Sequence, residues 1–507
     1  MKNPIHPMKI LTAQQIRDCD AHTIAIEPIP SIDLMERASS RFVKAFEQVV
    51  SSQSKSVSIF CGTGNNGGDG LVIARLLHHK SWAVDCYLVQ FSEKMSPDNV
   101  ANQERLKDSG VSPKIITSIS DFPSEVHPLI IDALVGTGIT RPLEGLLGEV
   151  VQEINKCSGS VFAVDLPSGL FDRDDCSEYL DRIVHAHSTF TFQNPKRNFL
   201  LPEYANIVGA WQVLDIGLDH GFIDQLSCDE FLLQASDIQS LIQPRLAHSH
   251  KGTFGHAGLI CGSQGMVGAA VLSTSACLRS GAGLTTIMVP EVGYDILQTS
   301  CPEAMCLTSG QNYIAAVPNL EKYNAIGIGP GLGQNKATKD VLLDVIRNSH
   351  VPLVIDADGL NLLDETDLSN LPVNSIITPH PKEFERLFGK TENSHARISL
   401  LQKKAAPLNI IILLKGHHSA IAFPNGQLYF NSTGNPGMAK GGSGDVLTGL
   451  ITGLVARGYT SENAAVIGCY LHGLAGDICA DAIGMEGMTA LDLVHHLPEA
   501  WQILENL

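Results

Sequence analysis

Short apolar runs alternate with stretches of helical period along the whole chain. In the first half, two amphipathic helices are predicted at 11–26 and 33–50, and the predicted strands cover 55–60, 83–91, 129–132 and 161–165. The pattern restarts in the second half, where the predicted strands cover 257–261, 284–289, 325–328, 353–355, 375–378 and 409–414. Strands that alternate with helices indicate a mostly parallel sheet covered on both faces. The predicted fold class is therefore α/β, with the pattern repeated in two domains.

The hydrophobic periodicity is lost between the two segments that show the strand–helix pattern. Residues 218–228 mix polar and apolar positions without a clear period. A chain of 507 residues also exceeds the usual size of one hydrophobic core. We therefore predict a first domain over residues 1–222, a linker over 223–232 and a second domain over 233–507.

The net charge and the cysteines limit the partners and the cellular location that we expect for this protein. The chain carries 53 acidic and 35 basic side chains, a net charge of −18, which argues against nucleic acid or an anionic membrane as the main partner. The twelve cysteines are scattered without a C-x-x-C pair and are interpreted as reduced thiols, so a cytoplasmic location is predicted. No apolar run approaches the roughly 20 residues of a membrane span, and the first residues lack the apolar core of a signal peptide. A homo-oligomer is expected, although the sequence does not fix the oligomeric state.

Polar residues follow three predicted strands of the first domain, at the point where each strand ends. The first strand leads into the loop at 62–69, a later one ends at Asp132, and another ends at Asp165 shortly before Ser168. The loop matches G-x-G-x-x-G, but it also carries two asparagines and an aspartate, which suit hydrogen bonds to an amide or a sugar, or a hard cation. Any one of these acids alone is more simply a turn or cap residue. Because the carboxyl ends of parallel strands meet at one edge of a sheet, the three junctions together indicate one crevice.

The most distinctive stretch of the second domain is N-P-G-M-A-K-G-G-S-G-D at 435–445, followed by an apolar run. It predicts a tight loop that feeds a helix N-terminus, whose free N–H groups and positive dipole end suit an anion such as phosphate. Asp445 is well placed to take a proton from a hydroxyl, or else it simply caps the helix. His380, between two prolines, either holds a turn or contacts a ligand. The ordinary phosphate loop is absent, because Phe384 occupies its first glycine position before G-K-T at 389–391.

These motifs resemble those of a known pair of enzyme families. The stretch at 435–445 resembles the signature of the ribokinase-like NAD(P)H-hydrate dehydratases, over roughly residues 235–503. In the first half, N-N-G-G-D-G, D-A-L-x-G-T-G and D-x-P-S-G resemble the NAD(P)H-hydrate epimerase domain, over roughly residues 9–217. The resemblance implies a Rossmann-like three-layer α/β/α domain followed by a ribokinase-like α/β domain. It also implies that the first domain interconverts the R and S hydrates of NADH and NADPH. The second would dehydrate the S form with ADP, by phosphorylation of the ring hydroxyl and elimination of phosphate, giving AMP.

The resemblance also implies the residues of each site. In the second domain Asp445 is the catalytic base, and the residues that contact the hydrate are Ala270, Gly331, His380 and Asp445. ADP or AMP, with magnesium, is bound by Lys415, Gly416, His417, His418, Ser419 and Gly444. In the first domain Asp165 helps to move the proton, and the hydrate is contacted by Asn65, Asn66, Gly67, Gly68, Asp69, Gly136, Thr137, Gly138, Ile139, Thr140, Arg141, Pro142 and Asp165. A potassium ion is bound by Asn66, Asp132 and Ser168.

Two other functions stay open at this point. The second domain could be a ribokinase-type kinase of a vitamin precursor alcohol, with a regulatory first domain; such an enzyme would need ATP and release a stable phosphorylated product. Alternatively, the first domain is a binding or scaffolding module, but a scaffold has no need of the loop at 65–69 together with Asp132 and Asp165. The sequence leaves open the preference for NADH or NADPH, the choice between ADP and ATP, and whether substrate passes directly between the two sites.

Overall fold

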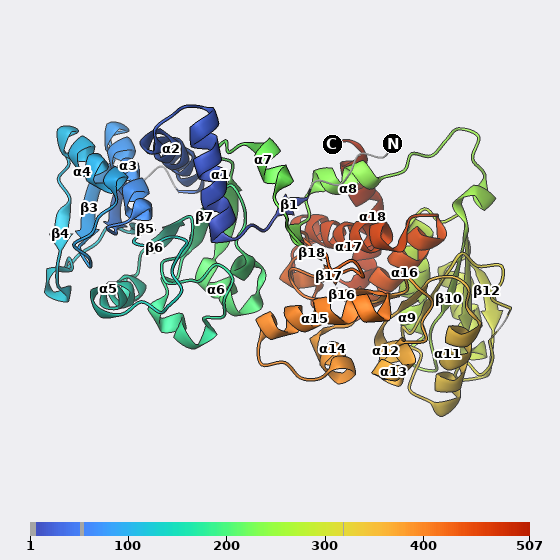
Figure 1. The fold of residues 1–507 in the computed structure, drawn as a ribbon. Helices are drawn as coiled ribbons and strands as arrows, with labels where there is room; N and C mark the ends of the chain where they lie inside the picture. Colours follow the sequence, from blue (N-terminus) through green and yellow to red (C-terminus); the bar gives the residue numbers. More distant parts are fainter. Residues whose placement is uncertain (1–6, 51–54, 318) are drawn as a thin grey trace. The chain divides into compact units, whose positions relative to one another are not determined.

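The computed structural model describes residues 7–50, 55–317 and 319–507 (Figure 1). Contacts between residues divide the chain into two compact units, Lys9–Cys228 and Asp229–Leu507, with Pro7 and Met8 grouped with the second. The division falls inside the short strand β1 (Met8–Lys9). The predicted linker at 223–232 contains the end of helix α7 (His220–Gln225), which the aperiodic pattern there did not predict, and strand β9 (Glu230–Leu232).

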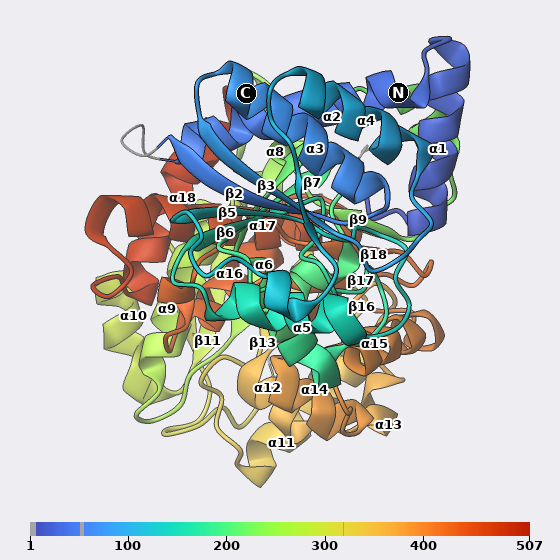
Figure 2. The same cartoon turned by 90° about the vertical axis from the view of Figure 1, so that its left-hand side faces the viewer.

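The first unit, Lys9–Cys228, is built on a seven-stranded sheet. Its strand order is β4-β3-β2-β5-β6-β7-β8, and every neighbouring pair is parallel. The strands are β2 (Ser56–Cys61), β3 (Ala83–Val89), β4 (Lys114–Ile116), β5 (Leu129–Ala133), β6 (Ser160–Val164), β7 (Ser188–Phe192) and β8 (Ala210–Leu214). The helices are α1 (Ala13–Ile26), α2 (Ser31–Val49), α3 (Asn65–His79), α4 (Pro97–Asp108), α5 (Gly145–Lys156), the short α6 (Ala205–Val208) and α7. Figure 2 shows α2, α3 and α4 on one side of this sheet and α5 on the other, so the unit has the three expected layers.

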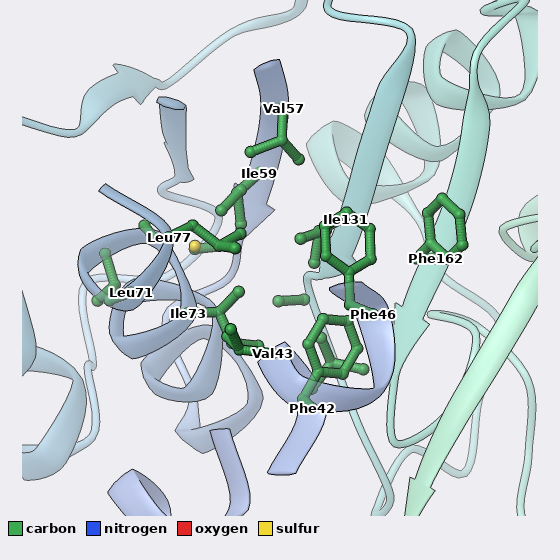
Figure 3. Packing of buried hydrophobic residues seen from close by; sticks show 14 of the residues in the cluster. Phe42, Val43, Phe46, Val57, Ile59, Leu71, Ile73, Leu77, Ile131 and Phe162 are labelled. Carbon is green, nitrogen blue, oxygen red and sulfur yellow. The ribbon is translucent and has the colours of Figure 1, made fainter. Parts of the chain in front are cut away.

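The alternation of side chains along β2 explains the two covered faces. Ile59 points into the core beneath α2 and α3, whereas its neighbour Phe60 points to the opposite face and packs in the cluster that includes α5. Phe42 and Phe46 of α2 meet the sheet in an edge-to-face arrangement, with Phe46 and Phe162 rings 5.0 Å apart (Figure 3). Since these rings are fully buried, replacing Phe46 with alanine is expected to cost about 3–5 kcal/mol.

The second unit is built on a larger, mixed sheet. Its order is β1-β9-β18-β17-β16-β15-β14-β13-β10-β11-β12. The strands after β9 are β10 (His256–Ile260), β11 (Leu284–Val289), β12 (Met305–Thr308), β13 (Ala325–Ile328), β14 (Leu353–Ile355), β15 (Ile376–Ile377), β16 (Ile411–Leu414), β17 (Ala420–Ala422) and β18 (Leu428–Phe430). Strands β10 to β16 are parallel, whereas β16, β17 and β18 form antiparallel pairs. Asn425 and Gly426 lie in the turn between β17 and β18, where Gly426 has a φ of 89°.

Helices cover both faces of this second sheet (Figure 1). They are α8 (Ala235–Leu241), α9 (Val267–Arg279), α10 (Tyr294–Ser300), α11 (Lys336–Asn348), α12 (Ala357–Leu362), α13 (Glu365–Leu368), α14 (Pro381–Phe388), α15 (Ser394–Leu408), α16 (Ser443–Ala456), α17 (Ser461–Ile483) and α18 (Ala490–Glu505). Helix α16 packs closely on α9, because a Cβ atom at Gly449 would lie 1.9 Å from the backbone oxygen of Ser273. Gly449 is therefore a close-packing position between the two helices.

One described helix, α17, is long and apolar enough to cross a membrane by length and composition alone. Its most apolar 18-residue window has a mean hydropathy of 1.3, and 56% of that window is buried inside the unit. Such burial is the behaviour of a core helix, and one helix of this kind is weak evidence for a membrane span.

Candidate functional site

The glycine-rich loop of the second unit ends at the start of α16, as the sequence predicts. Gly442 is the N-cap residue and has a φ of 96°, a left-handed conformation that glycine adopts without strain. No side chain caps the helix, so the first-turn N–H groups have no side-chain acceptor. Asp445 is the third residue of α16, one turn inside the cap. The interpretation of Asp445 as the capping residue is therefore wrong, and its carboxylate is free for another role.

Helix α17 and the turn after it hold this loop in place. Asp477 of α17 accepts hydrogen bonds from Gly434 N and from Asn435 Nδ2, both at 2.9 Å. His472 Nε2 lies 2.9 Å from the backbone oxygen of Ser443, the first residue of α16. Lys440 Nζ donates to the backbone oxygens of residues 486 and 488 at 2.6 and 2.8 Å. The loop lysine is therefore bound to the protein itself, and the start of α16 is fixed from behind.

Asp356 and Lys415 lie beside the start of α16. Lys415 Nζ, after β16, donates to Asp356 Oδ1 at 2.6 Å, and Asp356, after β14, is only 1% exposed. The Thr448 hydroxyl of α16 donates to Asp356 Oδ2 at 3.0 Å. A Cβ atom at Gly444 would lie 3.2 Å from Asp356 Oδ2 and 3.3 Å from Lys415 Nζ. These contacts bring the ends of two strands and the first turn of α16 together at one point.

The carboxylate of Asp445 has an unusual affinity for a proton. Burial raises its pKa to about 6, and the negative charges of Asp356 and Asp358 act in the same direction. Lys415 opposes this rise but does not cancel it, because its charge is already paired with Asp356. Asp445 is thus mostly ionised at neutral pH and is still able to receive a proton, as a general base must.

A cavity of about 650 Å³ opens at this point. Of the residues predicted for the two ligands, it is lined by His380, Lys415, Gly416, His417, Ser419 and Gly444. The lining also includes Lys440, Ser443 and His472. Its size and its wall of glycine-loop and strand-end residues fit a nucleotide with its phosphates toward α16.

His418 and His380 need separate descriptions. His418 does not line the cavity; its Nδ1 lies 3.0 Å from the backbone oxygen of Asn431, and burial lowers its pKa to about 4. His380 is the N-cap residue of α14, and its Nδ1 accepts hydrogen bonds from the backbone N–H groups of Lys382 and Glu383. The His380 ring therefore holds the turn and also faces the cavity, so the two interpretations of this residue are compatible.

The other three predicted hydrate contacts, Asp445, Gly331 and Ala270, do not line the cavity, although Ser443 and Gly444, directly before Asp445, do. Gly331 has a φ of 59°, and a Cβ atom there would lie 2.6 Å from the backbone oxygen of Met266. Its own backbone oxygen accepts a hydrogen bond from Ser263 Oγ at 2.9 Å. The glycine loop after β13 is also tied to Asp358, which accepts from Gly333 N at 2.9 Å. Ala270 is fully buried on α9.

In the first unit, the predicted potassium ligands lie at neighbouring strand ends. Asp132 is fully buried and accepts hydrogen bonds from Ser168 Oγ at 2.6 Å and Ser168 N at 2.8 Å. Burial raises the pKa of Asp132 to about 6, and these hydrogen bonds oppose the rise. Asn66 donates from Nδ2 to the Val164 oxygen, while its buried Oδ1 has no hydrogen-bond partner. Asn66 follows β2, which pairs with β5, the strand that carries Asp132, and an unpartnered buried oxygen at this edge of the sheet suits a hard cation.

Asp165 is held by a lysine that the sequence analysis did not identify as a site residue. Asp165 has a φ of 66°, which is uncommon for a residue with a side chain. Its Oδ1 accepts hydrogen bonds from Lys196 Nζ at 2.8 Å, Phe192 N at 2.9 Å and Thr191 Oγ1 at 3.1 Å. The Lys196 side chain is only 2% exposed. The one available signal was a lysine directly after Asn-Pro beyond a buried strand.

Other carboxylates face the same crevice. Asp69 accepts from Ser39 Oγ at 3.2 Å, and burial raises its pKa well above the usual range, with a further contribution from Asp165. Asp20 of α1, also not predicted, has its pKa raised to about 6 by burial and by the charge of Asp165. The loop after β5 lies near α1 as well, since a Cβ atom at Gly138 would lie 3.7 Å from Arg17 Nη1.

Gly136 packs on Asn66, and Gly67 and Gly68 are buried in the first turn of α3, where Asn65 is exposed. The rest of the loop after β5 forms its rim: Thr140 and Arg141 are exposed, and Thr137, Ile139 and Pro142 are half-buried.

Comparison with known proteins matches both units. A family model described as NAD(P)H-hydrate dehydratase matches residues 257–499, and one described as YjeF-related protein N-terminus matches residues 31–198. The chain is 36% identical to the bifunctional NAD(P)H-hydrate repair enzyme of Moorella thermoacetica, with 98% of each chain covered. It is 32% identical to the enzyme of the same name from Escherichia coli, with 97% of this chain and 94% of the relative covered.

A solved structure also matches the second unit. It is the ADP/ATP-dependent NAD(P)H-hydrate dehydratase of Bacillus subtilis, crystallised with ATP and Mg²⁺. The match has a TM-score of 0.50 and 33% identity, and it covers 54% of this chain and 98% of the other. The predicted ribokinase-like architecture of the second unit is therefore confirmed at the level of the fold.

Proposed function

This chain belongs to the family of bifunctional NAD(P)H-hydrate repair enzymes, and we propose that Asp445 is the base of its dehydration step. The observation that carries this proposal is the position of Asp445 in the uncapped first turn of α16, beside a cavity fit for a nucleotide. The chain acts on hydrated NADH or NADPH, with the epimerase activity in the first unit and the dehydratase activity in the second.

The dehydration begins with phosphorylation of the ring hydroxyl of the S hydrate. Asp445 removes the hydroxyl proton as the oxygen attacks the terminal phosphorus of ADP, and the bond from that phosphorus to the bridging oxygen breaks to leave AMP. The N–H groups of Gly442 to Gly444 and the ammonium of Lys415 stabilise the charge on the moving phosphoryl group. The C–O bond of the new phosphate ester then breaks to release phosphate, a much better leaving group than hydroxide, and loss of a proton from the neighbouring ring carbon restores the C=C bond of the dihydropyridine.

The donor nucleotide is assigned to the cavity beside α16. Lys415, Gly416, His417, Ser419 and Gly444 contribute to its wall, which supports binding of ADP there. No cluster of three or more metal-binding His, Cys, Asp or Glu side chains occurs in residues 7–50, 55–317 and 319–507. Because Mg²⁺ usually binds through substrate phosphates and one or two carboxylates, magnesium is assigned to the phosphates of the donor.

In the first unit, Asp165 is the group that moves a proton during interconversion of the R and S hydrates. Lys196 fixes the orientation of the Asp165 carboxylate, and the loop at 65–69 with the loop at 136–142 binds the substrate. A potassium ion would be held by Asn66 Oδ1 together with Asp132 and Ser168. It would supply a fixed positive charge near the anionic nucleotide.

Chromatography of the two hydrates tests the assignment. Wild-type protein with ADP and magnesium should convert both epimers to NADH or NADPH with release of AMP. Asp445→Asn should keep epimerisation but lose dehydration by roughly 10²–10⁴-fold, the usual contribution of a positioned base. A stable phosphorylated product made only with ATP would instead identify a ribokinase-type kinase. The cytoplasmic location and the homo-oligomeric state remain predictions.

A further inference from the structure

Asp356 has no role in the reaction steps proposed above, yet its carboxylate makes several hydrogen bonds beside the cavity. Its side chain is almost fully buried at the end of β14, and both of its oxygens are occupied. Oδ1 accepts from Lys415 Nζ at 2.6 Å and from the N–H of Ala357 at 2.8 Å, while Oδ2 accepts from Thr448 Oγ1 at 3.0 Å. One carboxylate therefore joins β14, the residue that follows β16 and the first turns of α16.

We propose that Asp356 is a positioning residue of the dehydration reaction, which anchors Lys415 and α16 to the sheet and places negative charge beside the base Asp445. This inference rests on the proposed role of Asp445. The anchoring is geometric: Thr448 lies one turn after Gly444 on α16, and a Cβ atom at Gly444 would already lie within 3.4 Å of both partners of the ion pair. The first turn of α16 thus has a fixed distance from the lysine.

Because Lys415 is ion-paired with Asp356, its positive charge acts on Asp445 only without direct pairing. Lys415 is the cation that acts on Asp445, and its charge is paired with Asp356. The carboxylate of Asp356 and, more weakly, that of Asp358 oppose ionisation of Asp445. The other titratable groups around this point are the Cys261 thiol, Glu383 with His380 on α14, and His472 on α17.

Burial holds Cys261 as the thiol and holds His472 neutral, so neither adds a charge beside Asp445 at neutral pH. The charge of Asp356 therefore raises the pKa of Asp445 and increases its affinity for the substrate proton.

Two substitutions separate the charge of Asp356 from its anchoring. Asp356→Asn removes the charge and keeps one oxygen that can accept from Lys415, while its amide N–H can donate to the Thr448 hydroxyl, whose own proton then goes to the Gly444 oxygen 3.1 Å away. The acid limb of the pH profile of kcat/KM for dehydration, expected near pH 6 in the wild type, should move down by about one unit. Asp356→Ala removes the anchor as well, and should in addition raise KM for ADP about tenfold, because Lys415 and α16 are no longer held.

Asp358→Asn and Thr448→Val are the matched controls. Asp358 is also near Asp445 but does not contact Lys415, so its substitution should give a smaller shift of the acid limb and no change in KM for ADP. Thr448→Val removes one anchoring bond without a charge, so KM for ADP should rise while the acid limb stays in place. This variant tests the anchor even if both Asp356 variants fail to fold.

Each outcome bears on the proposal. An acid limb that does not move in Asp356→Asn, or a uniform loss of rate at every pH, assigns Asp356 a structural role only and overturns the inference. An unchanged KM for ADP in Thr448→Val overturns the anchoring. Failure of the proposed function looks different: the wild type would leave both hydrates untouched, or Asp445→Asn would retain full activity.

Discussion

The buried ion pair between Lys196 and Asp165 is expected to contribute strongly to the free energy of unfolding of the first unit. Lys196→Met keeps the length of the side chain and removes its charge. The substitution leaves Asp165, which is 15% exposed, without its cation, while the bonds from Thr191 and Phe192 remain. Breaking a buried pair from one side typically costs about 3–5 kcal/mol, and the two remaining bonds place the expected loss at about 3 kcal/mol.

The structure offers a control of nearly equal geometry. Lys114 and Asp85 also form an ion pair, with Nζ and Oδ1 2.7 Å apart, but the Lys114 side chain is 60% exposed. Because water screens an exposed pair, Lys114→Met should cost less than about 1 kcal/mol. The difference between the two variants therefore measures the effect of burial at almost constant distance.

Urea unfolding followed by tryptophan fluorescence is the assay. The chain has three tryptophans, of which Trp82 and Trp211 lie in the first unit, so Trp501→Phe gives a background in which fluorescence reports that unit alone. With a slope of about 2 kcal/mol per molar urea, Lys196→Met should lower the midpoint by about 1.5 M. Asp165→Asn combined with Lys196→Met should be less destabilised than the sum of the single changes, by about 2 kcal/mol. An unchanged midpoint, or strict additivity, would refute the assignment of the pair as a mutual stabiliser.

Three further predictions follow from the same geometry. Gly449→Ala should unfold the second unit at lower temperature and reduce dehydration, because its Cβ meets a backbone oxygen at 1.9 Å, whereas Gly441→Ala, with nothing within 4 Å, should fold normally in a thermal melt. Asp445→Asn should be more stable than the wild type at pH 7 and not at pH 4. Since burial raises the folded pKa of Asp445 from 3.8 to about 6, the wild type loses up to about 3 kcal/mol as the pH rises through this window, which urea midpoints at the two pH values would reveal. Replacing potassium with a large organic cation should slow epimerisation and leave dehydration of the S hydrate unchanged, and Asn66→Ala should show the slow rate in either salt; equal rates in both salts would remove potassium from the site.

The elements of the fold were predictable because their signals are local. Apolar runs gave the positions of most strands of both sheets, and the glycine-rich stretch correctly indicated the start of α16. The N-cap residue of α16 was harder to predict, because aspartate and glycine are both common at helix N-termini. Only the backbone conformation identifies Gly442, and not Asp445, as the N-cap. Helix α7 was missed because six residues are too few to establish a helical period.

The charged partners of the two candidate bases were not predictable in this way. Lys196 and Asp165 are 31 residues apart, and Lys415 and Asp356 are 59 apart, so each pair exists only after the strands have assembled. A lysine beyond a buried strand has the same local pattern whether it points into solvent or into a carboxylate. The resemblance to a known family suggested Lys415 as a nucleotide contact, but neither the pattern nor the resemblance indicated its partner Asp356.

Each unit has a lysine–carboxylate pair at its proposed base, but the two pairs are arranged differently. In the first, Lys196 binds Asp165 itself, so the cation and the oriented carboxylate form one group at the crevice. In the second, Lys415 is bound to Asp356, and Asp445, the proposed base, has an elevated pKa. A base that must take a proton from an alcohol gains from high proton affinity, whereas a carboxylate fixed by a buried ammonium gains in orientation. The two proposed bases therefore differ in whether a lysine binds the carboxylate directly, and at Asp445 burial and the charge of Asp356 raise the pKa where no lysine is bound to the carboxylate.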